Sequence, residues 1–230
     1  MNWVEAPTKE HKYAQTKLAL MYSAIEMLEH KSLESISVRE LCDSVHVPPG
    51  AFASYFASKT DLLWYFMQLW SIEVAWYAER AAGDRSGLAV IEAIFDRIAH
   101  EIGERPGLTA EIIALFARRH ESVASDLKEL SPAEGSLAFP GFEGVDKIPA
   151  KGIESILGQN LERALEGGEL APDTDLDSAR VALTAIFFGV PMAVHGRETQ
   201  GIGASYRQQL RLLWAGLRAI YPLPRSYHYG

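Results

Sequence analysis

One stretch of this 230-residue chain, residues 37 to 63, constrains its fold more than any other and reads SVRELCDSVHVPPGAFASYFASKTDLL. Its first part predicts a helix, because Ser37 and Glu40 have the spacing of a capping box and apolar residues then recur at helical spacing. His46 follows at a point where the chain needs a positive φ, which His tolerates better than most residues. The pattern therefore indicates a short helix that ends in a tight turn.

The second part of the stretch predicts another helix directly after this turn. Pro48 and Pro49 suit a first helical turn, where proline loses no hydrogen bond. Phe52 and Phe56 are expected in the core of this unit, and a second capping box at residues 58 to 61 opens a longer apolar helix. Two short helices joined by a tight turn, with the second free to enter a major groove, form a DNA-reading device.

The same stretch resembles the N-terminal DNA-binding region of the tetracycline-repressor (TetR) family of bacterial regulators. The resemblance covers about residues 13 to 64 and rests on Val47, Gly50, the pair Tyr55-Phe56 and the pair Ser58-Lys59. It implies that Tyr55 and Lys59 contact DNA phosphates on either side of the reading helix. A helix N-terminus at Lys59 agrees with this role, because its free N–H groups and macrodipole favour an anion. The full set of expected DNA-binding residues is Ser37, Arg39, Pro49, Gly50, Ala51, Ser54, Tyr55 and Lys59.

Three positions depart from the family's pattern. Ala53 stands where many members carry a second aromatic residue that touches a phosphate. Pro48 and Pro49 replace a polar pair, and His46 replaces a common glycine. These departures keep a second interpretation open, in which the DNA-binding head is vestigial.

The charge of the chain argues against a general nucleic-acid coat protein, since the net charge is −8 and such proteins are usually basic. Residues 1 to 64 carry six Lys or Arg against eight acids, so DNA affinity depends on where the basic residues lie. The important ones are Arg39, Lys59 and the group Lys9, Lys12 and Lys17.

The single cysteine, Cys42, rules out an intrachain disulfide and suits a reducing cytoplasm, where we expect it to pack as a small apolar residue. We expect no signal peptide and no membrane span, because no basic-then-apolar N-terminal segment and no sufficiently long apolar run is present. The sequence therefore predicts a cytoplasmic protein without a membrane partner.

The whole chain is predicted to be all-α. We divide it into a helix-turn-helix DNA-binding domain at residues 1–58 and a helical ligand-binding and dimerisation domain at residues 59–230. Residues 131 to 150 are rich in Gly and Pro, which predicts a long loop or a broken helix that could act as a lid. The longer helices are expected at residues 11–30, 59–82, 88–102, up to about 119 after Pro106, 149–166, 175–195 and 204–221.

The family resemblance also implies an effector cavity in the C-terminal domain. Its walls are expected from apolar helix faces, and its polar anchors from Tyr77, Arg97, His120 and Asn160. The ligand-binding residues that this hypothesis names are Trp70, Trp76, Tyr77, Phe95, Ile98, Ile112, Phe116, His120 and Phe187. The alternative for the aromatic residues is that they are mostly core.

The last two long helices, at 175–195 and 204–221, are predicted to form a homodimer as a four-helix bundle. The first carries a stripe of small residues, Ala182, Ala185, Gly189 and Ala193. The second carries an apolar stripe of Leu210, Leu213, Trp214 and Leu217. The alternative is that both stripes only pack the core of their own subunit.

The most favoured function is a ligand-responsive transcriptional repressor that binds a pseudo-palindromic operator and is released by a small molecule. The alternative is a helical small-molecule-binding or scaffold protein with a vestigial DNA head. An enzyme has no support in the sequence, since it contains no G-x-G-x-x-G, Walker or G-x-S-x-G motif. No metal or cofactor is expected, because no His pair has the i, i+4 spacing of a helical metal site.

Overall fold

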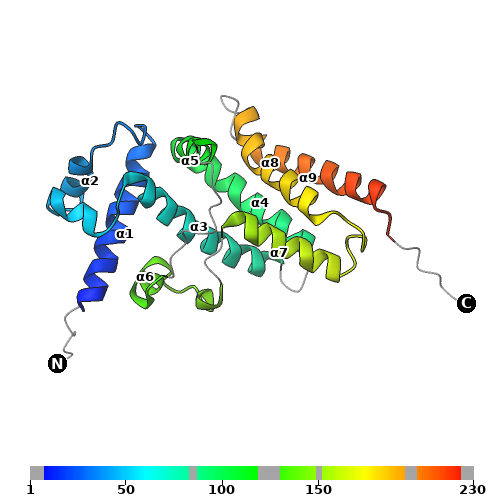
Figure 1. The fold of residues 1–230 in the computed structure, drawn as a ribbon, viewed down its shortest axis with the longest axis horizontal. Helices are drawn as coiled ribbons and strands as arrows, with labels where there is room; N and C mark the ends of the chain where they lie inside the picture. The colour runs from blue at the N-terminus through cyan, green and yellow to red at the C-terminus, as the bar shows by residue number, and fades with distance from the viewer. Residues whose placement is uncertain (1–7, 83–86, 119–129, 149–151, 195–200, 224–230) are drawn as a thin grey trace, which may run out of the picture. The chain divides into compact units, whose positions relative to one another are not determined.

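The computed structural model describes residues 8–82, 87–118, 130–148, 152–194 and 201–223. All regular structure within these ranges is helical, which confirms the all-α prediction (Figure 1). The elements in chain order are α1 (Lys9–Leu28), α2 (Val38–Ser44), the 3-10 helix η1 (Pro49–Ser54), α3 (Lys59–Ala82), α4 (Gly87–Glu104), α5 (Pro106–Arg118), α6 (Pro132–Ala138), the 3-10 turn η3 (Val145–Lys147), α7 (Ile153–Glu166), α8 (Leu176–Val194) and α9 (Gly201–Ile220).

The chain packs as two compact units. Unit 1 holds residues 1–73 and 105–150, and unit 2 holds residues 74–104 and 151–230. The break falls inside α3, a helix of 24 residues that no Gly or Pro interrupts. The predicted division at residue 58 separates functions, not packing units, and it stays a prediction.

Unit 1 is built on α1, whose buried face includes Leu20, Met21 and Ile25. Leu62 and Leu63 from the start of α3 are fully buried in the same core. Helices α2 and α5 also pack on α1. The unit therefore gathers every element of the predicted DNA-binding head around one apolar core.

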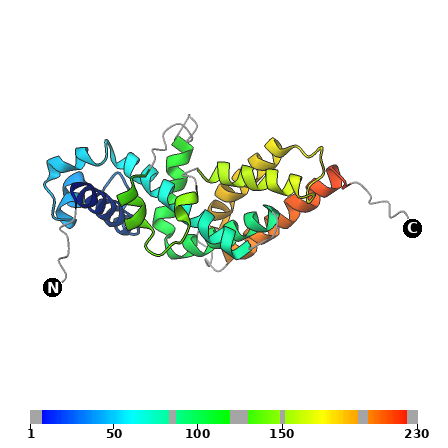
Figure 2. The same cartoon turned by 90° about the horizontal axis from the view of Figure 1, so that it is seen from below.

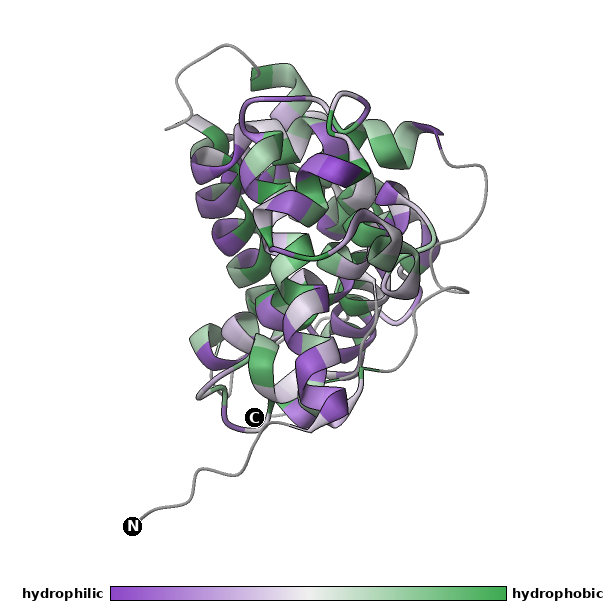
Figure 3. Ribbon diagram, turned by 90° about the vertical axis from the view of Figure 1, so that its left-hand side faces the viewer, coloured by the Kyte–Doolittle hydropathy of each residue, from purple (hydrophilic) through white to green (hydrophobic). Residues whose placement is uncertain are grey.

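Unit 2 is built from α4, α7, α8 and α9, with α4 against both α7 and α9 and α8 against both α7 and α9. Hydrophobic and hydrophilic residues alternate along the helices of the protein, as the colours of Figure 3 show. Helices α4 and α7 approach closely at Gly87, where an added Cβ would lie 2.0 Å from the backbone oxygen of Asn160. The hydroxyl of the buried Tyr206 in α9 donates to the Phe187 carbonyl of α8 at 2.8 Å.

The structure specifies two sequence predictions about local structure. The predicted second helix of the helix-turn-helix begins at Pro49 and is a 3-10 helix. The segment at 131–150 is a broken helix, as predicted, but its α6 packs on α1 in unit 1 with Phe139 buried (Figures 1 and 2). This packing gives the segment a structural role in unit 1, which does not favour a lid.

Among the described residues, one helix, α8, is long and apolar enough to cross a membrane by length and composition. Only 28% of its apolar window is buried, and it carries Asp177 and Arg180. A single helix of this kind is weak evidence for a membrane span, because the core helix of a soluble protein meets the same criteria.

Candidate nucleic-acid interface

The first helix of the helix-turn-helix is capped as the sequence predicts. Ser37 is the N-cap of α2, and its hydroxyl accepts from the Glu40 backbone N–H at 3.1 Å. The Glu40 carboxylate pairs with Lys31, and the hydrogen bond from Lys31 lowers the pKa of Glu40. Arg39 lies on the outer face of α2 with 82% of its side chain exposed, 3.7 Å from the Asp43 carboxylate.

The turn between the two helices also matches the prediction. His46 has a φ of 58°, and it is the non-glycine residue with positive φ among the described residues. The Val47 N–H returns to the Cys42 carbonyl at 3.0 Å, which closes the turn. Cys42 itself is fully buried, as expected for a small apolar residue.

The predicted reading element is η1, and the structure presents most of it to solvent. Pro49, Gly50 and Ser54 are exposed and Ala51 is half-buried, while Phe52 is buried and fixes the element to the core. Pro48 supplies no side-chain cap, so the element begins without a hydrogen bond of that kind. Phe56 is buried as well, at 5.9 Å between ring centroids from Phe52, as the sequence predicted.

The end of η1 is held by a tyrosine of α1. The Tyr13 ring stacks on Tyr55 with 4.8 Å between centroids and an interplanar angle of 29°. The Tyr13 hydroxyl donates to the carbonyl of Ser54, the last residue of η1, at 2.9 Å. Tyr55 is half-buried, so its ring is fixed by packing while part of it remains accessible.

Lys59 is bound inside unit 1. Its ammonium donates to the carbonyls of Leu33 at 2.6 Å, Glu34 at 3.2 Å and Ile36 at 2.6 Å. A lysine ammonium has three donors, so these carbonyls of the α1–α2 connection account for all of them. Contact with a DNA phosphate requires Lys59 to give up one of these bonds.

The basic side chains of the head differ in whether they already have an interaction partner within the protein. Lys17, Lys31 and Arg39 each face a carboxylate, and Lys59 faces the three carbonyls. Lys9 and Lys12, on the first turns of α1, are exposed, and no partner for their ammonium groups is found among the described residues. These two lysines lie on the same helix as Tyr13, which contacts the end of η1.

Helix α6 is fastened to α1 by an ion pair with little access to solvent. Lys17 Nζ lies 2.6 Å from Glu134 Oε1, with 18% and 8% of the two side chains exposed. The same ammonium lies 3.9 Å from the centroid of the Tyr65 ring. Burial opposes ionisation of Glu134, but the bonds from Lys17 and from the Ser131 N–H outweigh it and lower its pKa.

Helix α5 is fixed to the end of α1 by backbone contacts. The Glu29 carboxylate accepts from the N–H groups of Gly107 at 3.2 Å and Leu108 at 3.1 Å. At Gly107 an added Cβ would lie 2.3 Å from the Leu28 carbonyl oxygen, so only glycine permits this approach. Glu111 accepts from the Leu33 N–H at 3.1 Å, and thereby α5 also holds the α1–α2 connection.

The residues predicted to bind an effector are divided between the two units. Trp70, Ile112 and Phe116 belong to unit 1, where Phe116 meets Trp64 edge-on at 5.1 Å between centroids. Phe95, Ile98 and Phe187 are buried in unit 2, with Phe95 edge-on against Tyr206. Trp76 and Tyr77 also lie in unit 2, and His120 lies outside the described residues. The common cavity therefore stays a prediction.

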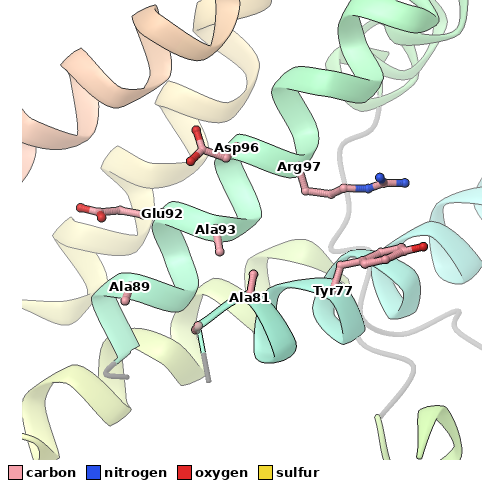
Figure 4. Close-up of a pocket in the computed structure, with 8 residues that line it drawn as sticks. Tyr77, Ala81, Ala89, Glu92, Ala93, Asp96 and Arg97 are labelled. Carbon is pink, nitrogen blue, oxygen red and sulfur yellow. The ribbon is translucent and has the colours of Figure 1, made fainter. Parts of the chain in front are cut away.

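A pocket of about 450 Å³ opens between the end of α3 and α4 in unit 2 (Figure 4). Small side chains line it, and Tyr77 and Arg97 stand at one side with the guanidinium carbon 4.6 Å from the ring centroid. Glu92 and Asp96 point away from this pair and bind Trp214 and Arg207 of α9. Its lining residues are Tyr77, Ala81, Ala82, Ala89, Glu92, Ala93, Asp96 and Arg97. Only Tyr77 and Arg97 of the predicted effector residues take part, and the Asn160 amide binds the Ile156 carbonyl of its own helix.

Helices α8 and α9 keep an exposed apolar surface. Val181 and Met192 of α8 are 66% and 62% exposed, and Leu212 and Ile220 of α9 are 57% and 69% exposed. The predicted small-residue stripe of α8 lies on this outer side, since Ala185, Gly189 and Ala193 are exposed. The predicted stripe of α9 is wrong in part: Leu210, Trp214 and Leu217 are buried in their own unit.

Sequence reasoning missed the contacts of Tyr13 and Glu134. The aromatic residue on the first helix carried no motif, and its partner lies 41 positions further along the chain. Glu134 did carry a signal, because Ser131 and Glu134 form a capping box that marks the start of α6. The partner of Glu134, Lys17, lies 117 positions away and no local pattern identifies it.

Comparison with known proteins identifies the head. Residues 20–64 match the model of the bacterial regulatory proteins of the tetR family. No curated protein sequence matches the chain.

Solved structures with the same fold are TetR-type regulators. The TetR-family repressor FadR of Thermus thermophilus, solved with lauroyl-CoA, is 17% identical with a TM-score of 0.62 over 87% of this chain and 94% of that one. RolR, solved with resorcinol, is 16% identical with a TM-score of 0.58 over 94% and 97%. A TetR regulator from Rhodococcus sp. RHA1 is 19% identical with a TM-score of 0.57 over 89% and 97%.

These identities establish the fold alone, whereas the matched model covers the helix-turn-helix itself. The capped α2, the turn at His46 and the exposed η1 have the geometry that a DNA-reading head requires. Residues 20–64 therefore match the helix-turn-helix domain of the tetR family of bacterial regulatory proteins, and the chain as a whole shares the fold of solved TetR-type regulators.

Proposed function

We propose that this protein is a cytoplasmic, homodimeric transcriptional repressor that leaves a pseudo-palindromic operator when a small molecule binds. The observation that carries the proposal is η1, a short helix whose outer face is exposed while Phe52 fixes its inner face to the core. A helix presented in this way has no packing role on its outer side and is free to enter a major groove.

The DNA contacts we propose come from both parts of the helix-turn-helix and from α1. Reading residues are Pro49, Gly50, Ala51 and Ser54, and Tyr55 contacts a phosphate next to them. Ser37 and Arg39 at the start of α2 meet the backbone of the other strand. Lys59 is retained as a phosphate contact only in the bound state, because its donors are occupied in the free head.

The homodimer we propose uses the exposed apolar surface of α8 and α9, within residues 175–195 and 204–221. Val181, Met192, Leu212 and Ile220 supply large apolar side chains, and the small residues of α8 permit a close approach of the partner helix. Burial of this surface in a dimer also explains why α8 is so apolar for a helix that is mostly uncovered in the subunit.

The effector we propose binds in the C-terminal region among the residues named from the sequence, starting from Tyr77 at the pocket of unit 2. Support comes from relatives of the same fold that were solved with lauroyl-CoA and with resorcinol. Both ligands combine apolar parts with oxygen atoms, and the lining of Tyr77, Arg97 and alanines offers a similar combination.

The alternative, a small-molecule-binding protein with a vestigial head, is favoured by one observation. Four of the six basic residues in the first 64 positions already face carboxylates or carbonyls. Selection of random duplexes by the purified protein separates the two functions. Enrichment of inverted half-sites supports the repressor, since a symmetric dimer demands a pseudo-palindrome. Enrichment of no site, with ligand binding intact, supports the vestigial head.

A further inference from the structure

The exposed face of η1 offers almost nothing that can form a hydrogen bond. Its sequence from Pro49 to Ser54 is PGAFAS, so the hydroxyl of Ser54 is the single polar side-chain group. Pro48 and Pro49 have no N–H, and the Ala51 N–H is bonded to the Pro48 carbonyl at 2.8 Å. The Ser54 carbonyl accepts from Tyr13. What remains exposed are proline rings, the backbone of Gly50, the methyl group of Ala53 and the hydroxyl of Ser54.

The side chains that η1 exposes cannot form the usual direct hydrogen bonds to purine bases. Guanine is read by a bidentate Arg or Lys and adenine by a bidentate Asn or Gln. None of these residue types occurs between Val47 and Phe56. Lys59 is the nearest such residue along the chain, and its ammonium is bound to three carbonyls of the α1–α2 connection, while Arg39 belongs to α2.

An apolar surface can still recognise one group in the major groove, the C5-methyl of thymine. Close approach favours this contact, because dispersion and exclusion of water need heavy atoms within about 4 Å of each other. Gly50 has no neighbouring atom within 4 Å of its Cβ position, so the backbone there is open to a base edge. Ala53 is also exposed and presents its methyl group on the same element.

The face is also held rigidly enough to make such short-range contacts selective. Phe52 anchors η1 from inside, the Tyr13 hydroxyl holds its last carbonyl, and the Tyr13 ring stacks on Tyr55. Contacts with a methyl group are not directional, so their selectivity depends on the position of the η1 surface. The contacts of α1 that hold η1 in position are therefore more important here than in a head that reads bases by hydrogen bonds.

We propose that η1 reads its operator through thymine methyl groups, so that methyl-bearing pyrimidines carry most of the sequence information of each half-site. This inference rests on the operator binding proposed above and specifies the chemistry of the bases that are read. The occupant of the face is double-stranded DNA with thymines at the positions that meet Gly50, Ala51 and Ala53.

The test uses the full-length protein and the duplex that selection enriches. Each thymine of one half-site is replaced singly by deoxyuridine, which removes only the methyl group. We expect the dissociation constant to rise about fourfold at each contacted thymine, the value for one buried methyl-sized group. Thymines outside the half-site serve as controls and should leave the affinity unchanged.

A rescue arm places the methyl group on a different base pair. Replacement of a contacted T·A pair by C·G should weaken binding, and 5-methylcytosine at that position should restore part of the loss, because its methyl occupies the same place in the groove. Uniform insensitivity to deoxyuridine, with the operator still bound specifically, would overturn the inference and leave the repressor proposal intact. Failure to enrich any operator would instead count against the repressor proposal itself.

A protein variant distinguishes methyl contacts from a hydrogen bond by the one hydroxyl. Ser54→Ala keeps the size of the surface and removes its single polar group. We expect this variant to enrich the same thymine positions as wild type and to lose the same factor in affinity on each deoxyuridine substitution. If Ser54→Ala abolished sequence preference, η1 would read by hydrogen bonding and the inference would be wrong.

Discussion

At the scale of single residues, two side chains of the head act through backbone carbonyls. Tyr13 holds the carbonyl at the end of η1, and Lys59 holds three carbonyls of the α1–α2 connection. Both therefore stabilise the positions of elements that precede or follow the turn at His46. Substitutions of Tyr13 and of Lys59 are expected to have different effects.

Tyr13→Phe should lower specific operator affinity by up to about fivefold, because one hydrogen bond contributes roughly 1 kcal/mol. The stacked ring remains, so the fold should be unchanged while amide exchange in η1 becomes faster than in α1. Tyr22→Phe is the matched control, since Tyr22 lies nine residues further along α1 and hence on the opposite face. Equal losses for specific and non-specific DNA would contradict a positioning role for Tyr13.

Lys59→Met should lower the free energy of unfolding by about 2–4 kcal/mol, since it leaves the carbonyls of Leu33, Glu34 and Ile36 without their charged donor. Lys12→Met, at an exposed lysine of α1, should change stability by less than about 0.5 kcal/mol. Urea unfolding followed by circular dichroism measures both. An unaltered midpoint for Lys59→Met would assign this lysine to DNA alone.

At the scale of elements, the ion pair of Lys17 and Glu134 fixes α6 on α1. Lys17→Met leaves a carboxylate with 8% exposure unpaired, which should cost about 3 kcal/mol or more. The double variant Lys17→Met, Glu134→Gln should recover part of that loss, because it removes the buried charge as well. Additive losses in the double variant would show that the pair does not couple the two helices.

The lowered pKa of Glu134 also predicts how stability depends on pH. A carboxyl whose pKa is lower in the folded state stabilises the protein above its unfolded-state pKa and loses this effect as the pH falls through the folded value. The melting temperature of the wild-type protein should therefore fall further than that of Glu134→Gln when the pH is lowered from about 6 to about 3. Parallel losses in the two proteins would exclude Glu134 as a source of acid sensitivity.

Glycine positions at helix crossings give a prediction with an internal control. Gly107→Ala should destabilise unit 1, because the new Cβ would lie 2.3 Å from the Leu28 carbonyl oxygen. Gly103→Ala, in α4, meets nothing within 4 Å and should be neutral or stabilise by up to about 1 kcal/mol through helix propensity. Thermal unfolding of both variants tests the assignment, and equal effects would refute the close crossing of α1 and α5.

The elements themselves were largely predictable, and their partners were not. Predicted bounds for α3 coincide with the structure, because a capping box opens that helix and Gly83 follows its end. The reading element was predicted as a helix, and six residues that begin at the second of two prolines form a 3-10 helix without a side-chain cap. Local patterns indicate where a helix begins, whereas contacts such as Lys59 with Leu33 depend on packing between distant segments.

At the scale of the whole molecule, the exposed apolar surface of α8 and α9 predicts the assembly. Val181→Glu with Leu212→Glu should give folded monomers, because both side chains are more than half exposed in the subunit. Leu217→Glu should instead unfold unit 2, since that residue is 7% exposed. Sedimentation at micromolar concentration separates these outcomes. A native protein that already sediments as a monomer would exclude this surface as a dimer interface.

The pairing of basic residues predicts a shallow salt dependence of DNA binding. If only Lys9 and Lys12 of each subunit meet phosphates, a dimer forms four such contacts and the logarithmic slope should be about −3.6. Engagement of all six basic residues would give a slope of about −11. Titration of operator affinity between low and moderate salt measures this slope, and Lys9→Ala should reduce its magnitude by about 2 per dimer.

The same pairing has a consequence for how the protein finds its site in a cell. Chromosomal DNA offers roughly 10⁶–10⁹ competing positions, and attraction to them grows with the number of free cations on the protein. Lys17 and Lys31 face carboxylates within the protein, which offset their charge, and contribute little to that attraction. Most copies would then remain in free solution and not on bulk DNA, so a small number of molecules suffices to keep one operator occupied.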